Sequence, residues 1–250
     1  MTQASGPPDG ASEASGPDPS PAAGRGVPSS GANAPVPPPA AVVRGSVGLL
    51  GGTFDPVHHG HLAIAEDARE SLGLERVLWI PAASPPHKPG RPVTPAVHRL
   101  AMLDLALASN AAFEACDLEL RRGGLSYTVD TLAELRSIGI LDPWFVLSAE
   151  ALAGFPSWRD PGRILELARL AVVPRGGFAR LDRSWVEERY PGRGDRVIFL
   201  PGPLLPISGS VVRGRAAAGR SVRYLVPDAV AAYIADHRLY QPDASRTDTT

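Results

Sequence analysis

The sequence predicts an α/β fold in which a Rossmann-like, doubly wound parallel sheet follows a disordered N-terminal extension. From residue 46 onward short apolar runs alternate with amphipathic segments, an order typical of βαβ units in a parallel sheet. The first apolar run ends in Gly51-Gly52, which favours a buried strand entering a glycine loop. Ahead of it, residues 1–44 hold ten prolines and no Leu, Ile, Phe, Tyr or Trp, so they cannot bury enough apolar surface to fold.

Six short runs have the length and composition of strands. They are rich in apolar residues, and several stop at proline or glycine, which interrupt a strand ladder. We expect strands at residues 47–50, 77–81, 112–120, 144–147, 171–173 and 197–200.

Between these runs, apolar side chains recur at helical spacing. Gly73 stands where a helix starting near residue 60 needs a left-handed C′ residue, and Thr128 is a candidate N-cap. We expect helices at residues 61–72, 95–108, 128–138, 161–169, 209–218 and 227–237. The chain thus divides into a tail at 1–44, one domain at 45–241 and a polar tail at 242–250.

The composition argues against several classes of protein. The chain has 25 Lys and Arg against 26 Asp and Glu, so bulk charge does not favour binding to nucleic acid or anionic lipid. No apolar run approaches the roughly 18 residues of a membrane span. The single cysteine, Cys116, cannot form an internal disulfide, so we expect a cytoplasmic location. The oligomeric state is open.

The loop after the first strand carries the strongest chemical signal. Gly51 and Gly52 would let the backbone approach a phosphate, and a helix starting near Gly60 would point its free N–H groups at the same place. His58 and His61 are three residues apart, so both rings can share one face and donate to phosphate oxygens. The loop lacks the third glycine of a dinucleotide fingerprint and the Gly-Lys-Ser/Thr of a Walker A loop.

A zinc site is the alternative interpretation of this loop. His58, His59 and His61 are three histidines within four residues, but helical zinc ligands prefer a spacing of four and need a further ligand. The other alternative is a polar loop without function, and for His59 a side chain without a role is the favoured interpretation.

Residues 53–61, Thr-Phe-Asp-Pro-Val-His-His-Gly-His, resemble the HxGH signature of the nucleotidyltransferase superfamily. Further segments resemble bacterial nicotinate-nucleotide adenylyltransferases, and with the signature they cover about residues 46–241. These segments are Pro-Pro-His-Lys at 85–88, Ser-Tyr-Thr-Val-Asp-Thr-Leu at 126–132, Pro-Ser-Trp at 156–158, Val-Val-Pro-Arg at 172–175, Ile-Ser-Gly-Ser-Val-Val-Arg at 207–213, and the last helix through 240.

This resemblance implies a nucleotidyltransferase-type fold and a specific reaction. The phosphate of nicotinate mononucleotide would attack the α-phosphorus of ATP in line, giving deamido-NAD and pyrophosphate in NAD biosynthesis. No protein nucleophile is needed, so catalysis would consist of positioning and charge stabilisation. Mg²⁺ would accompany ATP, carried by phosphate and water oxygens rather than by a protein metal site.

The resemblance also implies roles for particular residues. The catalytic residues would be His58, His61, Lys88 and Arg213. ATP and its phosphates would be bound by Gly51, Gly52, Thr53, Phe54, Gly60, Ser208, Gly209, Ser210 and Glu150. The nicotinate nucleotide would be bound by His87, Thr128 and Trp158.

Two positions depart from the family pattern. Gly209 stands where a hydroxyl residue is usual, and Ser148-Ala149-Glu150 replaces Gly-x-Asp, so we expect weakened or reshaped ATP binding. These departures keep open a non-catalytic nucleotide-binding relative. Other open alternatives are nicotinamide mononucleotide or phosphopantetheine as the acceptor, and a cytidylyltransferase.

Overall fold

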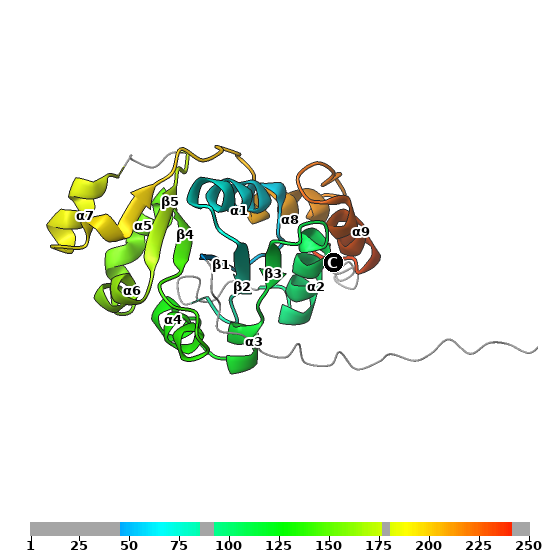
Figure 1. Cartoon of the computed structure of the whole chain (residues 1–250). Helices are drawn as coiled ribbons and strands as arrows, with labels where there is room; N and C mark the ends of the chain where they lie inside the picture. Colours follow the sequence, from blue (N-terminus) through cyan, green and yellow to red (C-terminus); the bar gives the residue numbers. More distant parts are fainter. Residues whose placement is uncertain (1–45, 86–92, 177–180, 242–250) are drawn as a thin grey trace, which may run out of the picture. The chain divides into compact units, whose positions relative to one another are not determined.

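A six-stranded parallel sheet forms the centre of the domain (Figure 1). The computed structural model describes residues 46–85, 93–176 and 181–241, and both predicted tails lie outside these ranges. The strands lie in the order β3-β2-β1-β4-β5-β6, every neighbouring pair being parallel, so the predicted α/β class is confirmed. Their bounds are β1 Val47–Gly52, β2 Arg76–Pro81, β3 Phe113–Ala115, β4 Trp144–Ser148, β5 Arg169–Val173 and β6 Val197–Phe199.

Helices cover both faces of this sheet. The helices are α1 His59–Leu72, α2 Ala96–Leu107, α3 Leu118–Arg122, α4 Thr128–Ser137, α5 Ala149–Gly154, α6 Pro161–Leu167, α7 Arg183–Arg189, α8 Gly209–Ala217 and α9 Asp228–Asp236. The described residues also include two 3₁₀ turns, η1 Phe155–Ser157 and η2 Gly194–Arg196. Within the described ranges, no helix combines the length and apolarity needed to cross a membrane.

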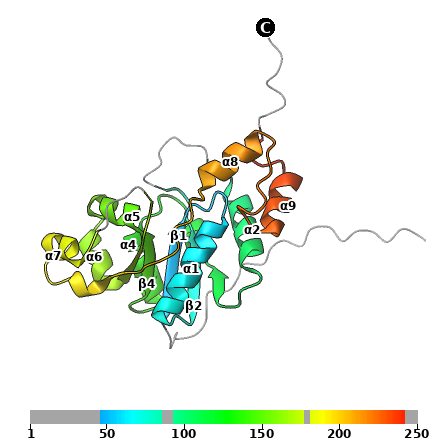
Figure 2. The same cartoon turned by 90° about the horizontal axis from the view of Figure 1, so that it is seen from above.

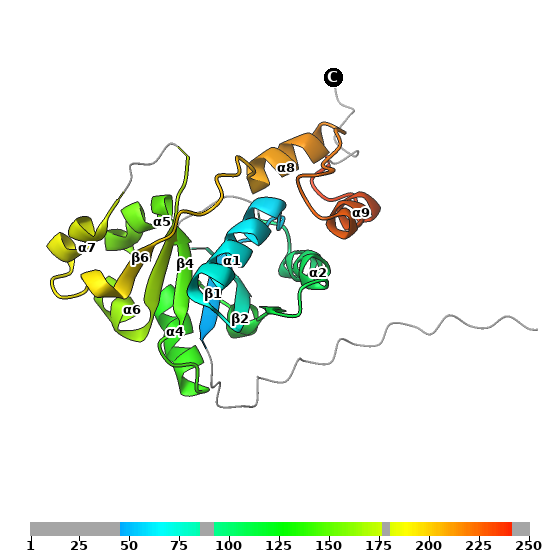
Figure 3. The ribbon, with the colours of Figure 1, turned by 45° about the horizontal axis from the view of Figure 1, so that its top comes forward.

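Successive residues of the central strand point to opposite faces, as the strand repeat requires. Leu49 packs into an apolar cluster that α4 and α6 complete, whereas Leu50 packs into a second cluster with α1, α2 and α9. Figures 2 and 3 show α1, α2, α8 and α9 on one side of the sheet and α4 and α6 on the other. β1 pairs with β2 on one side and β4 on the other, which places the loop after β1 between two strand ends.

Most predicted elements are present within a residue or two, but two predictions need correction. The strand-like run at 112–120 is a short strand followed by α3, because Leu118 and Glu119 are buried on a helical turn. Thr128 is the first residue of α4 rather than its N-cap, a position that Tyr127 occupies with extended backbone. The sequence analysis also missed α5 and α7. By contrast, Gly73 ends α1 with a φ of +59°, as predicted.

Candidate active site

A cavity of about 1060 Å³ opens at the carboxyl ends of β1, β4 and β5. This is the part of a doubly wound sheet where ligands bind, because loops from neighbouring strands diverge there. The predicted site residues that line it are Gly51, Gly52, Thr53, Phe54, His58, His61, Thr128, Glu150, Trp158, Ser208, Gly209, Ser210 and Arg213. His87 and Lys88 lie outside the described residues.

The loop after β1 is shaped by a buried aromatic ring. Phe54 has a left-handed φ of 49° and a side chain only 2% exposed. Its ring centroid lies 5.4 Å from that of Trp79 and 5.2 Å, edge-on, from that of His61. A Cβ on Gly52 would lie 3.0 Å from the Phe54 ring, so the glycine lets this ring pack. The Phe54 ring therefore supports His61 from the side of the core.

His58 and His61 stack at the start of α1, with ring centroids 3.6 Å apart and an interplanar angle of 16°. The backbone N–H of His58 donates to His61 Nδ1 at 3.3 Å, which leaves the proton of a neutral His61 ring on Nε2. A Cβ on Gly60 would lie 3.1 Å from His58 Nδ1, so Gly60 makes room for the His58 ring. The shared face predicted from the spacing is confirmed.

His58 is buried in this stack and only 5% exposed. Burial first, and then the positive charge of Arg175, lower the pKa of His58 to about 4. Its Nδ1 is buried without a hydrogen-bond partner among the described residues. At neutral pH the ring is therefore uncharged, and it can offer hydrogen bonds to a phosphate but no positive charge.

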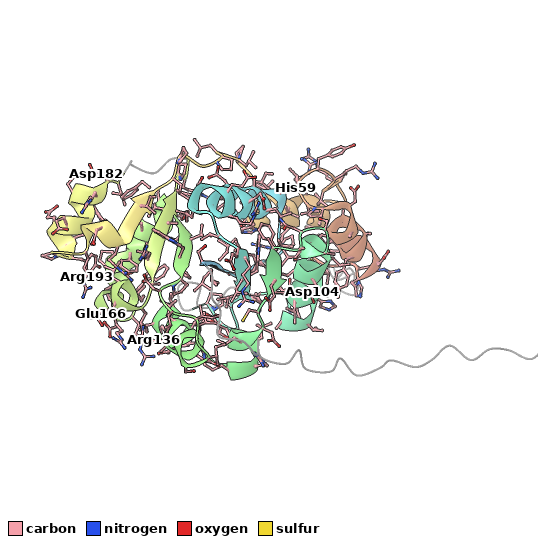
Figure 4. All side chains as sticks on the ribbon, in the orientation of Figure 1. His59, Asp104, Arg136, Glu166, Asp182 and Arg193 are labelled. Atoms are coloured by element: carbon pink, nitrogen blue, oxygen red, sulfur yellow. The ribbon has the colours of Figure 1, made fainter. Side chains whose placement is uncertain are left out.

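The third histidine of the loop does not join this pair. His59 is the first residue of α1 (Figure 4), and its backbone N–H donates to the carbonyl of Leu225 at 3.0 Å. Among the described residues, no group of three or more His, Cys, Asp and Glu side chains is placed to hold a metal ion. The zinc interpretation thus gains no support from these residues.

The N-terminus of α8 faces the same cavity. Ser208 caps this helix, its Oγ accepting from Val211 N–H at 3.3 Å. Arg213 Nη1 donates to the backbone carbonyl of Asp55 at 2.6 Å, and its Nη2 donates to Ser210 Oγ at 3.2 Å. Backbone N–H groups at a helix start together with a held guanidinium form a favourable place for a phosphate.

Gly209 has a structural role that the sequence analysis did not recognise. A Cβ at this position would lie 2.8 Å from the carbonyl oxygen of Asp55 and 3.2 Å from Arg213 Nη1. From the sequence, Gly209 is a departure from a hydroxyl residue that is expected to weaken or reshape ATP binding. In this chain it lets the start of α8 lie directly against the loop after β1, and a serine side chain would collide there.

The other departure from the family pattern is accounted for at the end of β4. Ser148 Oγ accepts from Ala151 N–H at 3.2 Å, so Ser148 is the N-cap of α5. Glu150, in the first turn, lies 3.5 Å from Arg175 Nε, and both side chains are about half exposed at the rim of the cavity. Arg175 also lines the cavity but is not among the residues predicted for the site, although its place two residues after β5 could have indicated it.

A different group of side chains lines the cavity at the start of α4 and just after η1, a part that we call its far end. Trp158 packs against two core phenylalanines and also lines the cavity, as does Thr128. Arg159 lies over the Tyr127 ring at 4.8 Å and pairs with Asp130 at 3.1 Å. Asp130 therefore braces Arg159, a cavity residue that the sequence analysis did not select.

These features together define a class of protein. In this class, the first strand of a parallel α/β sheet leads into a stacked histidine pair, and a second helix start, here that of α8, lines the same cavity. The sequence profile of the family described as cytidylyltransferase-like matches residues 49–215, in agreement with the nucleotidyltransferase resemblance.

Two curated relatives narrow the class. A protein of Thermomicrobium roseum, named "Probable nicotinate-nucleotide adenylyltransferase", is 48% identical over 78% of this chain and 91% of its own length. A protein of Roseiflexus sp. with the same name is 49% identical over 78% of this chain and 98% of its own. The chain belongs to the nicotinate-nucleotide adenylyltransferase family.

Solved structures agree on the fold. The Plasmodium falciparum nicotinic acid mononucleotide adenylyltransferase, solved in complex with NaAD, superimposes with a TM-score of 0.65. The match covers 78% of this chain and 97% of that protein, at 17% sequence identity.

Proposed function

We propose that the protein transfers the adenylyl group of ATP to the phosphate of nicotinate mononucleotide, producing deamido-NAD and pyrophosphate. The observation that carries this proposal is that the stacked pair His58–His61 and the start of α8 with Arg213 line one cavity. A triphosphate can lie between these two groups of donors, and the relatives' names give the acceptor.

Catalysis then depends on hydrogen-bond donors that are in place before ATP binds. The acceptor phosphate attacks the α-phosphorus, the bond to the β-phosphate oxygen breaks, and charge grows on the departing pyrophosphate. His61 Nε2–H would donate to an α-phosphate oxygen, while Arg213 and the N–H groups around 208–210 would hold the departing phosphates. Lys88 would add a positive charge, a role that stays a prediction from the sequence.

A divalent metal ion enters as part of the nucleotide substrate, and we propose Mg²⁺. Glu150, the acidic side chain at the rim of the cavity, is paired with Arg175. The donor set of the described residues thus suits a cation held by phosphate and water oxygens, which is how Mg²⁺ is commonly bound.

The far end of the cavity suits the pyridine nucleotide. Trp158 would stack on the nicotinate ring, and Thr128 and backbone N–H groups near it would meet the carboxylate. His87 would help bind the nucleotide, as the family pattern implies. From the balanced charge and the single cysteine, we also propose a cytoplasmic location with small-molecule substrates rather than nucleic acid or membrane as partners.

The first experiment is a pyrophosphate-release assay on purified protein with Mg-ATP. Nicotinate mononucleotide, nicotinamide mononucleotide and phosphopantetheine are offered in parallel, and fast release is expected only with the first. Fast release with another acceptor would overturn the assignment of the pyridine end. Binding of ATP without release in any arm would favour a non-catalytic relative.

His61→Ala tests the reaction end of the cavity. Loss of one preorganised donor should lower kcat by roughly 10²–10³. The matched control is His59→Ala, because His59 contributes its backbone to the fold and lies outside the cavity lining. Equal activity in His61→Ala and the unsubstituted protein would remove His61 from the mechanism.

A further inference from the structure

Asp55 joins three separate parts of the chain at the edge of the cavity. It is 7% exposed, and each of its oxygen atoms accepts a hydrogen bond from a different segment. Tyr240 Oη donates to Oδ1 at 2.8 Å, Thr94 N–H donates to Oδ2 at 3.3 Å, and Arg213 Nη1 donates to the carbonyl oxygen at 2.6 Å. The loop after β1, the segment before α2, α8 and the residues after α9 therefore meet at this residue.

A second buried group, the guanidinium of Arg99, connects two of the same segments through hydrogen bonds. Arg99 is 1% exposed; its Nε donates to the carbonyl of Thr94 at 2.9 Å and its Nη1 to the carbonyl of Thr53 at 2.8 Å. Its positive charge lies near Asp55, so the buried carboxylate has an opposite charge close by. The Asp55 side chain consequently has little freedom to move while these partners stay in place.

The hydroxyl of Tyr240 is a donor that stays protonated. Burial raises the pKa of Tyr240, and the negative charge of Asp55 raises it further. None of the roles proposed above uses this tyrosine, which follows α9 at the end of the described chain. α9 packs against α2, and Figure 3 shows the two helices side by side.

The carbonyl of Asp55 also determines how α8 meets the cavity. It accepts from Arg213, and a Cβ on Gly209 would lie 2.8 Å from it, so helix start and loop touch without a spacer. A shift of Asp55 therefore displaces the guanidinium and the N–H groups that we assign to the triphosphate. The hydrogen bonds that the Asp55 side chain accepts from Thr94 and Tyr240 oppose such a shift.

We propose that Tyr240 is a positioning residue for the triphosphate-binding groups, acting through its hydrogen bond to Asp55 on the orientation of Arg213. This inference rests on the proposed function for the identity of the bound nucleotide. It assigns Tyr240 no contact with substrate and no proton transfer.

Tyr240→Phe tests the proposal because it keeps the ring and removes only the hydroxyl, which donates to Asp55. Loss of a hydrogen bond to a charged group should raise the KM for Mg-ATP, and the Kd of a non-hydrolysable ATP analogue, by about tenfold. The KM for nicotinate mononucleotide should stay within about twofold, because the hydrogen bonds of Asp55 go to Thr94, Arg213 and Tyr240 and not to the residues that we assign to this substrate. A purely structural role would lower the melting temperature and leave this split between the two substrates absent.

Tyr233→Phe is the matched control. Tyr233 lies on α9, its hydroxyl lies 3.0 Å from His98 Nδ1, and it is not among the hydrogen-bond partners of Asp55. This variant removes a similar hydroxyl from the same region and should leave both KM values unchanged. A rise in the KM for ATP as large as that of Tyr240→Phe would overturn the proposal.

A second variant, Asp55→Ala, removes the acceptor of this hydrogen bond and tests whether Tyr240 acts through Asp55. If it does, adding Tyr240→Phe to Asp55→Ala should change the ATP-analogue Kd by less than about twofold. Additive effects, or an unchanged Kd in Tyr240→Phe alone, would overturn the proposal. The analogue Kd separates the test of Tyr240 from the test of the proposed function. If the unsubstituted protein releases no pyrophosphate, the proposed function is refuted, but the effect of Tyr240→Phe on the analogue Kd still tests the role of Tyr240.

Discussion

Lowering the pH from 7.5 to 5 should remove about 2 kcal/mol of folding free energy through His58 alone. The folded protein holds the pKa of His58 at about 4, against 6.5 for the ordinary group. Between these two values the unfolded chain takes up a proton that the folded chain refuses, so stability falls as the pH falls. The full shift corresponds to about 3 kcal/mol, of which roughly two thirds is lost by pH 5.

Urea unfolding at several pH values measures this directly. The comparison variant is His58→Gln, which cannot titrate, and the quantity of interest is the change in unfolding free energy between pH 7.5 and 5. All other groups contribute equally to both proteins, so the unsubstituted protein should lose about 2 kcal/mol more than the variant. A difference below about 0.5 kcal/mol would refute the buried, neutral His58 on which the site description depends.

Three substitutions test other contacts of the site. Gly209→Ala puts a Cβ 2.8 Å from the Asp55 carbonyl oxygen, so the free energy of unfolding should fall by about 1–3 kcal/mol and the KM for ATP should rise. Unchanged values in urea unfolding and in kinetics would contradict the close approach of α8 to the loop after β1. Ser148→Ala removes the N-cap of α5 and should cost about 1 kcal/mol by thermal unfolding, with kcat within twofold; a stable variant would show that the cap is not needed. Arg213→Lys keeps the charge but loses the planar fork, so kcat/KM for ATP should fall at least about tenfold in the pyrophosphate assay; equal activity would mean that charge alone suffices.

Local patterns predicted the parts of the fold that depend on neighbouring residues. The apolar run at 47–50, the histidine spacing at the start of α1 and the C′ glycine at Gly73 each lie within a few residues, and the structure agrees with all three. α3 was misread because Leu118 and Leu120 alternate with charged residues as in a strand. Their helical turn is favoured by a distant contact, in which Thr131 Oγ1 donates to the buried Glu119 carboxylate at 2.5 Å.

The site residues could be predicted where the family motif specifies a side chain. They were harder to predict where the backbone of another segment determines which residue fits. Arg213 and the histidines follow from the motif, but the need for a glycine at 209 comes from the backbone of Asp55 on another segment. In the sequence Ser148 is only a departure from the family pattern, because α5, whose N–H at Ala151 its hydroxyl caps, was not predicted.

The loop that carries the histidines is held by residues that follow much later in the chain. Asp55 receives hydrogen bonds from Arg213, 158 positions on, and from Tyr240, 185 positions on. During synthesis on the ribosome the loop therefore emerges long before the groups that fix it, so these hydrogen bonds can form only after Arg213 and Tyr240 have been made. A nascent chain interrupted before α8 contains all six strands and the histidines, yet it lacks the guanidinium that shares their cavity. We therefore expect activity only after the chain has been made through α8 and Tyr240.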